Sequence, residues 1–288
     1  MFTGFQEEQT IKIEQTHPLY PKEWLELPDA PEAVYAVGDI ALLKQRKLTV
    51  VGSRRTPINA LRLGKQMAQS LCDAFVLVTG TADGGDSAAI EGALCGSGKI
   101  ICVLAGGFSA LPKTNLELLY KVSQKGLLLS PYSFETPVRE YSYEYRNKLL
   151  AKMSEGTLVL GAAKKSGALI TARYARRFKK ALFAIPYSPG VTAGEGCNAI
   201  IKAGGVLTES EADVFKYFNL APNESKKTLA LTEEETRIYQ ALKDKSEAHA
   251  SELAAELKIP VFKLLAKLSA LEVKGVVANL GGNRYTIV

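Results

Sequence analysis

The segment Gly52-Ser53-Arg54-Arg55-Thr56 follows directly on an apolar run and combines a glycine, hydroxyl groups and guanidinium groups. A glycine at such a point permits a tight turn with outward-facing backbone amides, and a guanidinium beside those amides suits an anion such as phosphate. The segment lacks the G-x-G-x-x-G fingerprint of dinucleotide sites, and many strand-to-helix turns need glycine for geometry alone. Gly52, Ser53 and Arg54 are therefore candidate phosphate-binding residues, with a plain turn as the alternative.

A second glycine-rich segment, Thr79-Gly80-Thr81-Ala82-Asp83-Gly84-Gly85-Asp86, follows the next apolar run. Gly80 and its neighbours predict another wall of the same anion site, because glycines let a sugar-phosphate backbone come close. Asp86 precedes a predicted helix over 87–94, and we interpret it as the N-cap of that helix rather than as part of the anion site.

The stretch Tyr141-Ser142-Tyr143-Glu144-Tyr145-Arg146-Asn147-Lys148 interleaves aromatic with basic and amide side chains, just before a predicted helix over 149–153. Aromatic rings stack on unpaired bases while Arg and Lys neutralise phosphates, which is the chemistry of single-strand binding. Tyr143, Tyr145, Arg146, Asn147 and Lys148 are therefore candidate binding residues. The alternative is a tyrosine cluster packed on the core, and at least one of the three tyrosines is expected to be structural.

Two more segments have the same loop-to-helix pattern: Ser166-Gly167-Ala168-Leu169-Ile170-Thr171-Ala172 and Gly194-Glu195-Gly196-Cys197-Asn198. Their amides, with the hydroxyls of Ser166 and Thr171, are expected at the same edge of a parallel sheet as the earlier loops. Ser166, Gly167 and Thr171 thus join the candidate site. Neither histidine lies in these loops, and no nucleophile–base or paired-carboxylate spacing is present, so the sequence indicates no catalytic group.

Short runs rich in Val, Ile and Leu alternate with amphipathic segments through the middle of the chain. The runs are 48–51, 75–78, 100–104, 127–129, 158–160, 182–185 and a weak 206–207. Runs without polar alternation are typical of parallel strands covered on both faces. The sequence therefore predicts an α/β fold with an extended Rossmann-like, mostly parallel sheet, whose ligands lie outside the carboxyl ends of the strands.

The same pattern divides the chain into four parts. Residues 1–45 contain Pro18, Pro21, Pro28 and Pro31 and are expected to form an irregular lead-in packed on the core. Residues 46–216 form the Rossmann-like domain with the candidate site, and the polar stretch 217–229 is expected to be a linker. Residues 230–288 begin with a Thr232–Glu235 capping box and predict three helices and a hairpin, which make a small C-terminal winged-helix domain.

The charge is unevenly distributed along the chain. The formal net charge is +6, but residues 139–180 contain eleven basic and three acidic side chains, which gives +8 there and about −2 elsewhere. This local excess favours an acidic partner, with a solvated helix face as the alternative. Residues 230–288 contain eight basic and eight acidic side chains, so we expect the tail to contact protein rather than DNA.

Composition excludes several other classes of protein. Cys72, Cys95, Cys102 and Cys197 have no C-x-x-C spacing, and the chain has only two histidines, so we expect reduced thiols and no metal or other cofactor. The polar N-terminus does not resemble a signal peptide, and no apolar run approaches the roughly 18–20 residues of a membrane span. We therefore expect a soluble, cytoplasmic protein.

Five motifs, in this order, resemble the DNA-processing A (DprA/Smf) family. They are VGSR at 51–54, TGTADGGD at 79–86, RNK at 146–148, SGALITA at 166–172 and GEGCN at 194–198. The resemblance spans about residues 20–210, and the tail is similar to the winged-helix domain that many members carry. It implies a Rossmann-like core that binds single-stranded DNA in a basic pocket and forms a homodimer. It also implies protection of incoming DNA and loading of the RecA recombinase during natural transformation, without catalytic turnover.

The resemblance also assigns roles to individual residues. Arg54, and Lys148 beside Arg146, correspond to phosphate contacts, and the aromatic residue that precedes the R-N segment corresponds to Tyr143 or Tyr145. The residues that shape the pocket correspond to Gly52, Ser53, Gly80, Ser166, Gly167 and Thr171.

Two other functions fit parts of the pattern. Rossmann-like nucleotide hydrolases of the lysine-decarboxylase-like family share the core architecture, but they need a PGGxGTxxE motif whose glutamate does the chemistry. Residues 166–172 occupy the comparable region here without that glutamate. A ligand-sensing transcription factor would use the tail on duplex DNA, and the net neutrality of the tail argues against this function.

Overall fold

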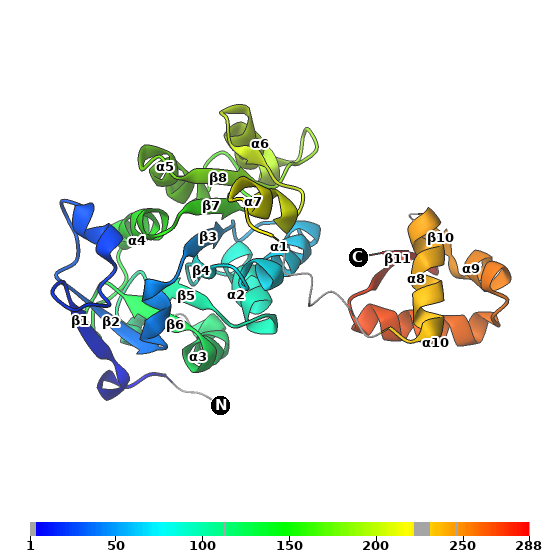
Figure 1. The fold of residues 1–288 in the computed structure, drawn as a ribbon, viewed down its shortest axis with the longest axis horizontal. Helices are drawn as coiled ribbons and strands as arrows, with labels where there is room; N and C mark the ends of the chain where they lie inside the picture. The colour runs from blue at the N-terminus through cyan, green and yellow to red at the C-terminus, as the bar shows by residue number, and fades with distance from the viewer. Residues whose placement is uncertain (1–3, 112, 222–230, 246, 288) are drawn as a thin grey trace. The chain divides into compact units, whose positions relative to one another are not determined.

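The computed structural model describes residues 4–111, 113–221, 231–245 and 247–287. The chain separates into two compact units, Met1–Asn223 and Glu224–Val288 (Figure 1). Among the described residues, no helix has the length and apolar character needed to cross a membrane.

A nine-stranded sheet runs through the first unit in the order β1-β2-β6-β5-β4-β3-β7-β8-β9. Its strands are β1 (Ile11–Glu14), β2 (Ala33–Gly38), β3 (Lys47–Val51), β4 (Val76–Thr79), β5 (Ile100–Val103), β6 (Leu127–Ser130), β7 (Gly156–Val159), β8 (Ala181–Ala184) and β9 (Val206–Leu207). The strands from β6 to β9 in this order are parallel, whereas β1 and β2 are antiparallel. The predicted α/β fold with a mostly parallel sheet is confirmed, and each of the seven apolar runs contributes a strand.

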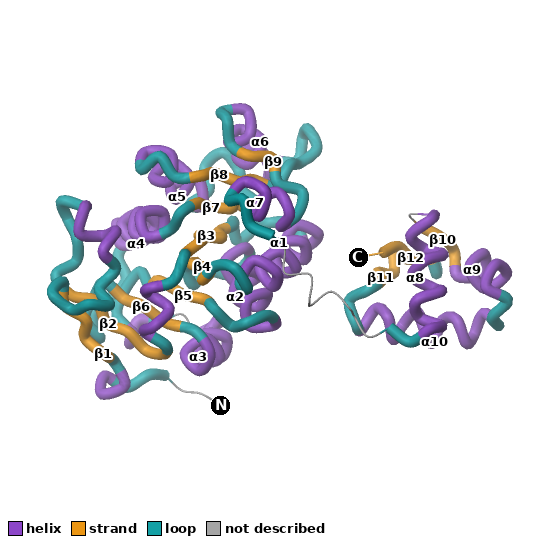
Figure 2. Tube along the Cα trace, in the orientation of Figure 1, coloured by secondary structure: helices purple, strands orange, loops and turns teal. Residues whose placement is uncertain are grey.

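Helices cover both faces of this sheet (Figure 2). One face carries α1 (Ile58–Leu71), α2 (Gly85–Cys95), α3 (Leu116–Lys125) and α7 (Glu211–Tyr217), and the other carries α4 (Glu140–Met153), α5 (Ala168–Arg177) and α6 (Glu195–Lys202). Short 3-10 segments are η1 (Glu7–Gln9), η2 (Lys22–Glu26), η3 (Ile40–Lys44), η4 (Phe108–Ala110), η5 (Lys113–Asn115) and η6 (Thr192–Gly194). Because β3 to β6 and β7 to β9 extend in opposite directions from the β3–β7 pair, a crevice is expected at the carboxyl ends of these two strands.

The N-terminal segment is more regular than the irregular lead-in expected from its prolines. β1 pairs with β2, and β2 pairs with β6 from Tyr35 opposite Ser130 to Gly38 opposite Leu127. Between them, η2 buries Trp24 completely, and its indole Nε1 donates to the carbonyl oxygen of Leu149 at 3.0 Å. The segment therefore completes the sheet and holds the middle of α4.

The second unit is a small winged-helix arrangement, as predicted. It contains α8 (Glu233–Lys245), β10 (Glu247–His249), α9 (Ala250–Leu257), α10 (Val261–Val273), β11 (Val277–Gly281) and β12 (Arg284–Ile287), with the strands ordered β10-β12-β11. The Thr232–Glu235 capping box is present, since the Thr232 amide donates to Glu235 Oε2 at 2.9 Å and the Glu235 amide donates to Thr232 Oγ1 at 3.3 Å. The short strand β10 was not predicted.

The expected linker at 217–229 lies partly outside the described residues. Within the described part, Tyr217 ends α7, and the ring of Phe218 packs against Phe75 and Phe183 at centroid distances of 5.3 and 5.8 Å. The first unit therefore continues beyond residue 216.

Candidate nucleic-acid interface

The loops after β3, β4 and β7 meet at the carboxyl edge of the sheet, and we call this edge the rim. The Ser53 amide donates to the Gly161 carbonyl at 2.8 Å, and the Gly85 amide donates to the Ser53 carbonyl at 3.3 Å. The two glycine-rich loops touch through their backbones, because a Cβ atom on Gly85 would lie 2.2 Å from the Gly52 Cα atom. Glycine at 52 and 85 is thus needed for the packing of one loop on the other.

Arg54 is exposed at the tip of the first loop. The Ser53 hydroxyl accepts from the Arg55 amide at 3.1 Å, and the Ser53 carbonyl accepts from the Thr56 hydroxyl at 2.8 Å. These bonds fix the turn from within, so the Arg54 side chain is not used to hold the loop. The rim therefore presents this guanidinium to solvent.

The aromatic and basic stretch at 141–148 lies inside α4, which begins nine residues before the predicted helix start at 149. Residues three and four apart share one face of a helix. Tyr143, Arg146 and Asn147 therefore lie on one face, and Tyr145 and Lys148 on another. The sequence pattern indicated one continuous binding segment, but the helix distributes these five side chains over two faces.

The first of these faces points into the rim. Arg146 is buried, and its Nη1 donates to the carbonyl of Val103 at the end of β5 at 3.0 Å, while its Nε donates to Asn147 Oδ1 at 2.9 Å. Asn147 Nδ2 donates in turn to the Gly167 carbonyl at 3.3 Å. Tyr143 keeps 44% of its surface exposed. Of this group, Tyr143 has the ring that is free for stacking.

The second face of α4 points to the N-terminal segment instead. The Lys148 ammonium forms an ion pair with Asp29 and lies 5.6 Å from the centre of the Tyr145 ring. The Tyr145 hydroxyl donates to the Asp29 carbonyl at 2.6 Å, and burial raises the pKa of this phenol. The structure therefore does not bring Lys148 and Tyr145 together with Arg54.

The loop before α5 completes the rim. The Ser166 hydroxyl accepts from the Ala168 amide at 3.3 Å and so stabilises the start of the helix. Gly167 is exposed, and a Cβ atom there would meet nothing within 4 Å. Thr171 is buried, and its hydroxyl has no hydrogen-bond partner within the described part of the chain. The structure thus gathers Ser53, Gly80, Arg146, Asn147 and Gly167 around one edge.

The interpretation of Asp86 as an N-cap is wrong. α2 begins at Gly85, its N-cap is Gly84 with φ +83°, and Asp86 lies buried in the first turn. Burial raises the pKa of Asp86, while Arg146 and the amides of Ala82 and Gly52 oppose this rise. Burial likewise lowers the pKa of Arg146, against the effect of Asp86. The sequence favoured a cap because Asp86 precedes the helix, and nothing in it pointed to a neighbour 60 residues away.

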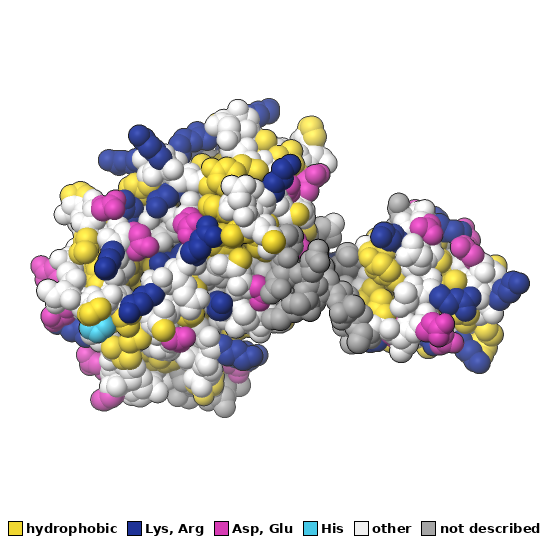
Figure 3. Space-filling view, viewed as in Figure 1, with side chains coloured by type: hydrophobic (Ala, Val, Ile, Leu, Met, Phe, Trp, Pro, Cys, Tyr) yellow, Lys and Arg dark blue, Asp and Glu magenta, His cyan; other side chains and the backbone are white. Residues whose placement is uncertain are grey.

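Exposed basic side chains continue from the rim over α5. Between residues 156 and 205 the chain has eight basic side chains and one acidic side chain, a net charge of +7. Figure 3 shows Lys and Arg side chains gathered over α5 and near α6. Those exposed beside the rim and along α5 are Lys164, Lys165, Arg173, Arg176 and Arg177. A polyanion that reaches the rim therefore meets a positive surface next to it.

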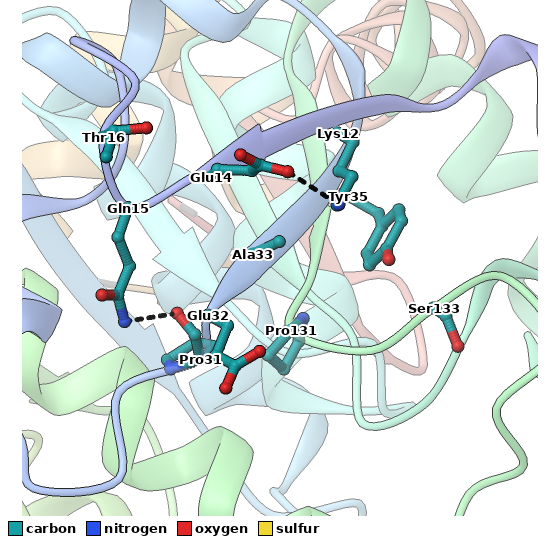
Figure 4. A pocket seen from close by; sticks show the side chains of 10 residues that line it. All are labelled: Lys12, Glu14, Gln15, Thr16, Pro31, Glu32, Ala33, Tyr35, Pro131 and Ser133. Carbon is teal, nitrogen blue, oxygen red and sulfur yellow. Dashed lines mark hydrogen bonds and ion pairs between the residues drawn. The ribbon is translucent and has the colours of Figure 1, made fainter.

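A separate cavity of about 620 Å³ lies at the β1–β2 end of the sheet (Figure 4). Glu14 and Glu32 line it, and Lys12 is paired with Glu14 at 2.8 Å. Carboxylates repel phosphates, so this cavity does not extend the positive surface. Among the described residues, no group of three or more His, Cys, Asp or Glu side chains is placed to hold a metal ion.

Comparison with known proteins finds a family-model match in each of the two units. Residues 12–219 match the family model described as DNA recombination-mediator protein A, and residues 222–283 match that of the DprA winged helix domain. The chain is 34% identical over 200 residues to the DNA processing protein DprA of Streptococcus pneumoniae, covering 69% of this chain and 71% of that protein. It is 31% identical over 211 residues to Protein Smf of Synechocystis sp., covering 71% of this chain but only 53% of that protein.

Solved structures show the same fold. The X-ray structure of DprA from Streptococcus pneumoniae matches with a TM-score of 0.69 and 31% identity, over 73% of this chain and 75% of that chain. A structure of DNA processing protein A from Helicobacter pylori, reported for its single-stranded DNA binding mode, matches with a TM-score of 0.67 and 27% identity, over 73% of this chain and 96% of that chain. The family model covers most of the chain, and the chain therefore belongs to the DNA recombination-mediator protein A family.

Proposed function

We propose that the protein binds single-stranded DNA along the rim and the adjoining α5 surface. The observation that carries this proposal is the exposed Arg54 beside a backbone-lined edge, next to a stretch with a net charge of +7. Phosphates are held by such cations and amides without sequence preference, while an exposed ring such as Tyr143 stacks on any base. Family membership and the reported DNA binding of the Helicobacter pylori relative support the same assignment.

The geometry refines the roles expected from sequence. Arg54 and Lys165 are proposed to contact phosphates directly, because these side chains are exposed. Lys164 is also proposed as a contact, because its side chain is 78% exposed and its ion pair with Glu195 is long, at 3.8 Å. Lys148 is proposed to anchor α4 to the N-terminal segment through Asp29. The site is also proposed to bind without catalytic turnover, as the family resemblance implies.

Replacing Arg54 by Ala is expected to weaken binding to every single-stranded sequence by about tenfold, because the variant neutralises one phosphate fewer and releases fewer counterions. For single strands, log K falls by about 0.7 per log unit of salt for each phosphate neutralised, so four to six neutralised phosphates give a slope of about −3 to −4. The variant should therefore reduce the magnitude of this slope by about 0.7 in fluorescence anisotropy titrations with oligothymidine.

Arg46→Ala is the matched control for that measurement. Arg46 precedes the amino end of β3, whereas Arg54 follows its carboxyl end, and Arg46 is paired with Glu155 at 2.6 Å. Both substitutions remove one positive charge from the molecule. Equal effects of the two on affinity and slope, or a preference of the protein for duplex DNA, would contradict a binding site at the rim.

Replacing Tyr143 by Ala is expected to cost about 1–3 kcal/mol of single-strand affinity, since a stacked base loses its aromatic partner. Tyr143→Phe should retain most of the affinity, because stacking needs the ring and not the hydroxyl. Tyr141→Ala serves as the control, since Tyr141 is 62% exposed but lies on a different face of α4. The assignment fails if both alanine variants bind like the parent protein in the same anisotropy assay.

The partners proposed from the family are a second copy of the chain and the RecA recombinase, with natural transformation as the process.

We propose that the winged-helix unit contacts protein. Four of its basic side chains are paired internally, in Lys245–Glu256, Lys267–Glu234, Lys274–Glu235 and Arg284–Glu247. Phe262 at the start of α10 is 71% exposed, which suits a protein contact better than a phosphate backbone.

A further inference from the structure

A buried polar network passes beneath the rim and connects parts of the chain that are distant in sequence. Arg146 bonds to Val103 at the end of β5 and to Asn147, and Asn147 bonds to Gly167 in the loop before α5. On the other side, Asp86 Oδ2 accepts from the Ala82 amide at 3.3 Å. The amide of Gly52 also opposes the rise in the pKa of Asp86, and a Cβ atom on Gly85 would lie 2.2 Å from the Gly52 Cα atom, so the first glycine-rich loop packs against this network.

Gly80 lies between the two charged members of this network. A Cβ atom on Gly80 would lie 2.1 Å from Nη1 of Arg146 and 2.4 Å from Oδ2 of Asp86. The guanidinium and the carboxylate therefore both lie at the place that a Cβ atom on Gly80 would occupy, and the second glycine-rich loop begins directly beside them. A bulkier residue would separate the two charges or displace the loop.

Each charge compensates the burial of the other. Arg146 and Asp86 are both only 5% exposed, and an isolated buried charge is strongly unfavourable. Asp86 also lies in the first turn of α2, where the helix dipole favours a negative charge. Arg146 uses Nη1 and Nε for protein acceptors, so these two donors are not available to a phosphate.

We infer that Asp86 and Arg146 act as a pair of positioning residues that sets the spacing of the rim loops, and that neither contacts the nucleic acid. This inference rests on the proposed single-strand binding at the rim. It differs from the assignment expected from sequence, in which Arg146 belongs to the phosphate contacts. The distinction is measurable, because removing a phosphate-binding cation reduces the salt slope, whereas displacing a loop lowers affinity and leaves the number of neutralised phosphates nearly unchanged.

The test compares Asp86→Asn, Arg146→Lys, Arg146→Gln and the double variant Asp86→Asn/Arg146→Gln with the parent protein, in oligothymidine titrations over a range of salt concentrations. We expect each single variant to lose at least about fivefold in affinity while its slope stays within about 0.3 of the parent value, below the roughly 0.7 of one phosphate. Arg146→Lys should lose affinity although it keeps the charge, because an ammonium cannot reproduce the guanidinium geometry. The double variant should lose less than the product of the two single losses, as expected for coupled residues.

A slope reduced by about 0.7 in Arg146→Gln, together with parent-like binding by Asp86→Asn and Arg146→Lys, would overturn the inference and make Arg146 a direct contact.

Amide hydrogen exchange separates this failure from failure of the proposed function. Without DNA, Asp86→Asn should speed exchange at Ala82 and Gly85 while leaving the Trp24 region unchanged. If the parent protein shows no salt-dependent binding but this exchange result holds, the proposed function fails and the positioning pair stands. If amide exchange at Ala82 and Gly85 is the same in Asp86→Asn as in the parent protein, the positioning role of Asp86 and Arg146 is contradicted.

Discussion

Gly85→Ala is expected to lower the free energy of unfolding of the first unit by about 3 kcal/mol, within the range of overpacked sites, and to reduce single-strand affinity strongly. The new Cβ atom would lie 2.2 Å from Cα and 2.6 Å from N of Gly52. Both neighbours are backbone atoms, so no side chain can rotate to relieve the overlap. The two glycine-rich loops must therefore separate. Urea denaturation monitored by circular dichroism measures the resulting loss in the free energy of unfolding.

Gly167→Ala provides the comparison for this prediction. Gly167 is also at the start of a helix, but its φ is −57° and its added Cβ atom would meet nothing within 4 Å. The free energy of unfolding of Gly167→Ala should therefore stay within about 0.5 kcal/mol of the parent value. A parent-like denaturation midpoint for Gly85→Ala would show that the two loops are not held in contact.

Trp24→Ala is expected to lower the free energy of unfolding by about 3–5 kcal/mol, the usual cost of truncating a buried large aromatic residue. Trp24 is fully buried, packs edge-on against Tyr20 with ring centroids 6.4 Å apart, and hydrogen-bonds to the Leu149 carbonyl. Its loss leaves a cavity between the N-terminal segment and α4. Because α4 also carries Tyr143 and Arg146, single-strand affinity should fall as well.

Leu25→Ala tests whether this effect belongs to the buried ring. Leu25 is in the same 3-10 segment but is 46% exposed, so its truncation should cost less than about 1 kcal/mol. Urea denaturation of both variants, followed by circular dichroism, gives the two free energies directly. Similar losses for Trp24→Ala and Leu25→Ala would mean that the N-terminal segment is not anchored through the indole.

The fold could be predicted where burial on both faces left an unbroken apolar run. All residues of β3 to β7 are buried, which explains why these strands were visible as continuous hydrophobic segments. β1 has the sequence IKIE with only Ile13 buried, and a run of four residues with two charges carries little strand signal. Its pairing with β2 depends on tertiary contacts that a local pattern does not contain.

The candidate site was predictable at its loops but not along its helix. Arg54 and Gly80 follow strands, and topology alone brings strand ends to one edge. The arrangement of 143–148 depends on where α4 starts, and a helix start at 140 rather than 149 turns Lys148 toward Asp29. The proximity of Asp86 to Arg146 depends on the order of the strands, which the spacing of motifs does not specify.

The position of β2 in the sheet has a consequence for synthesis of the chain. Tyr35 of β2 pairs with Ser130 of β6, 95 residues later in the sequence. At roughly 5–20 residues per second, a ribosome needs about 5–19 s to make the intervening chain. During that time β2 lacks its β6 partner and Trp24 lacks the α4 carbonyl to which it donates, so this early segment of the nascent chain is one on which a chaperone can act.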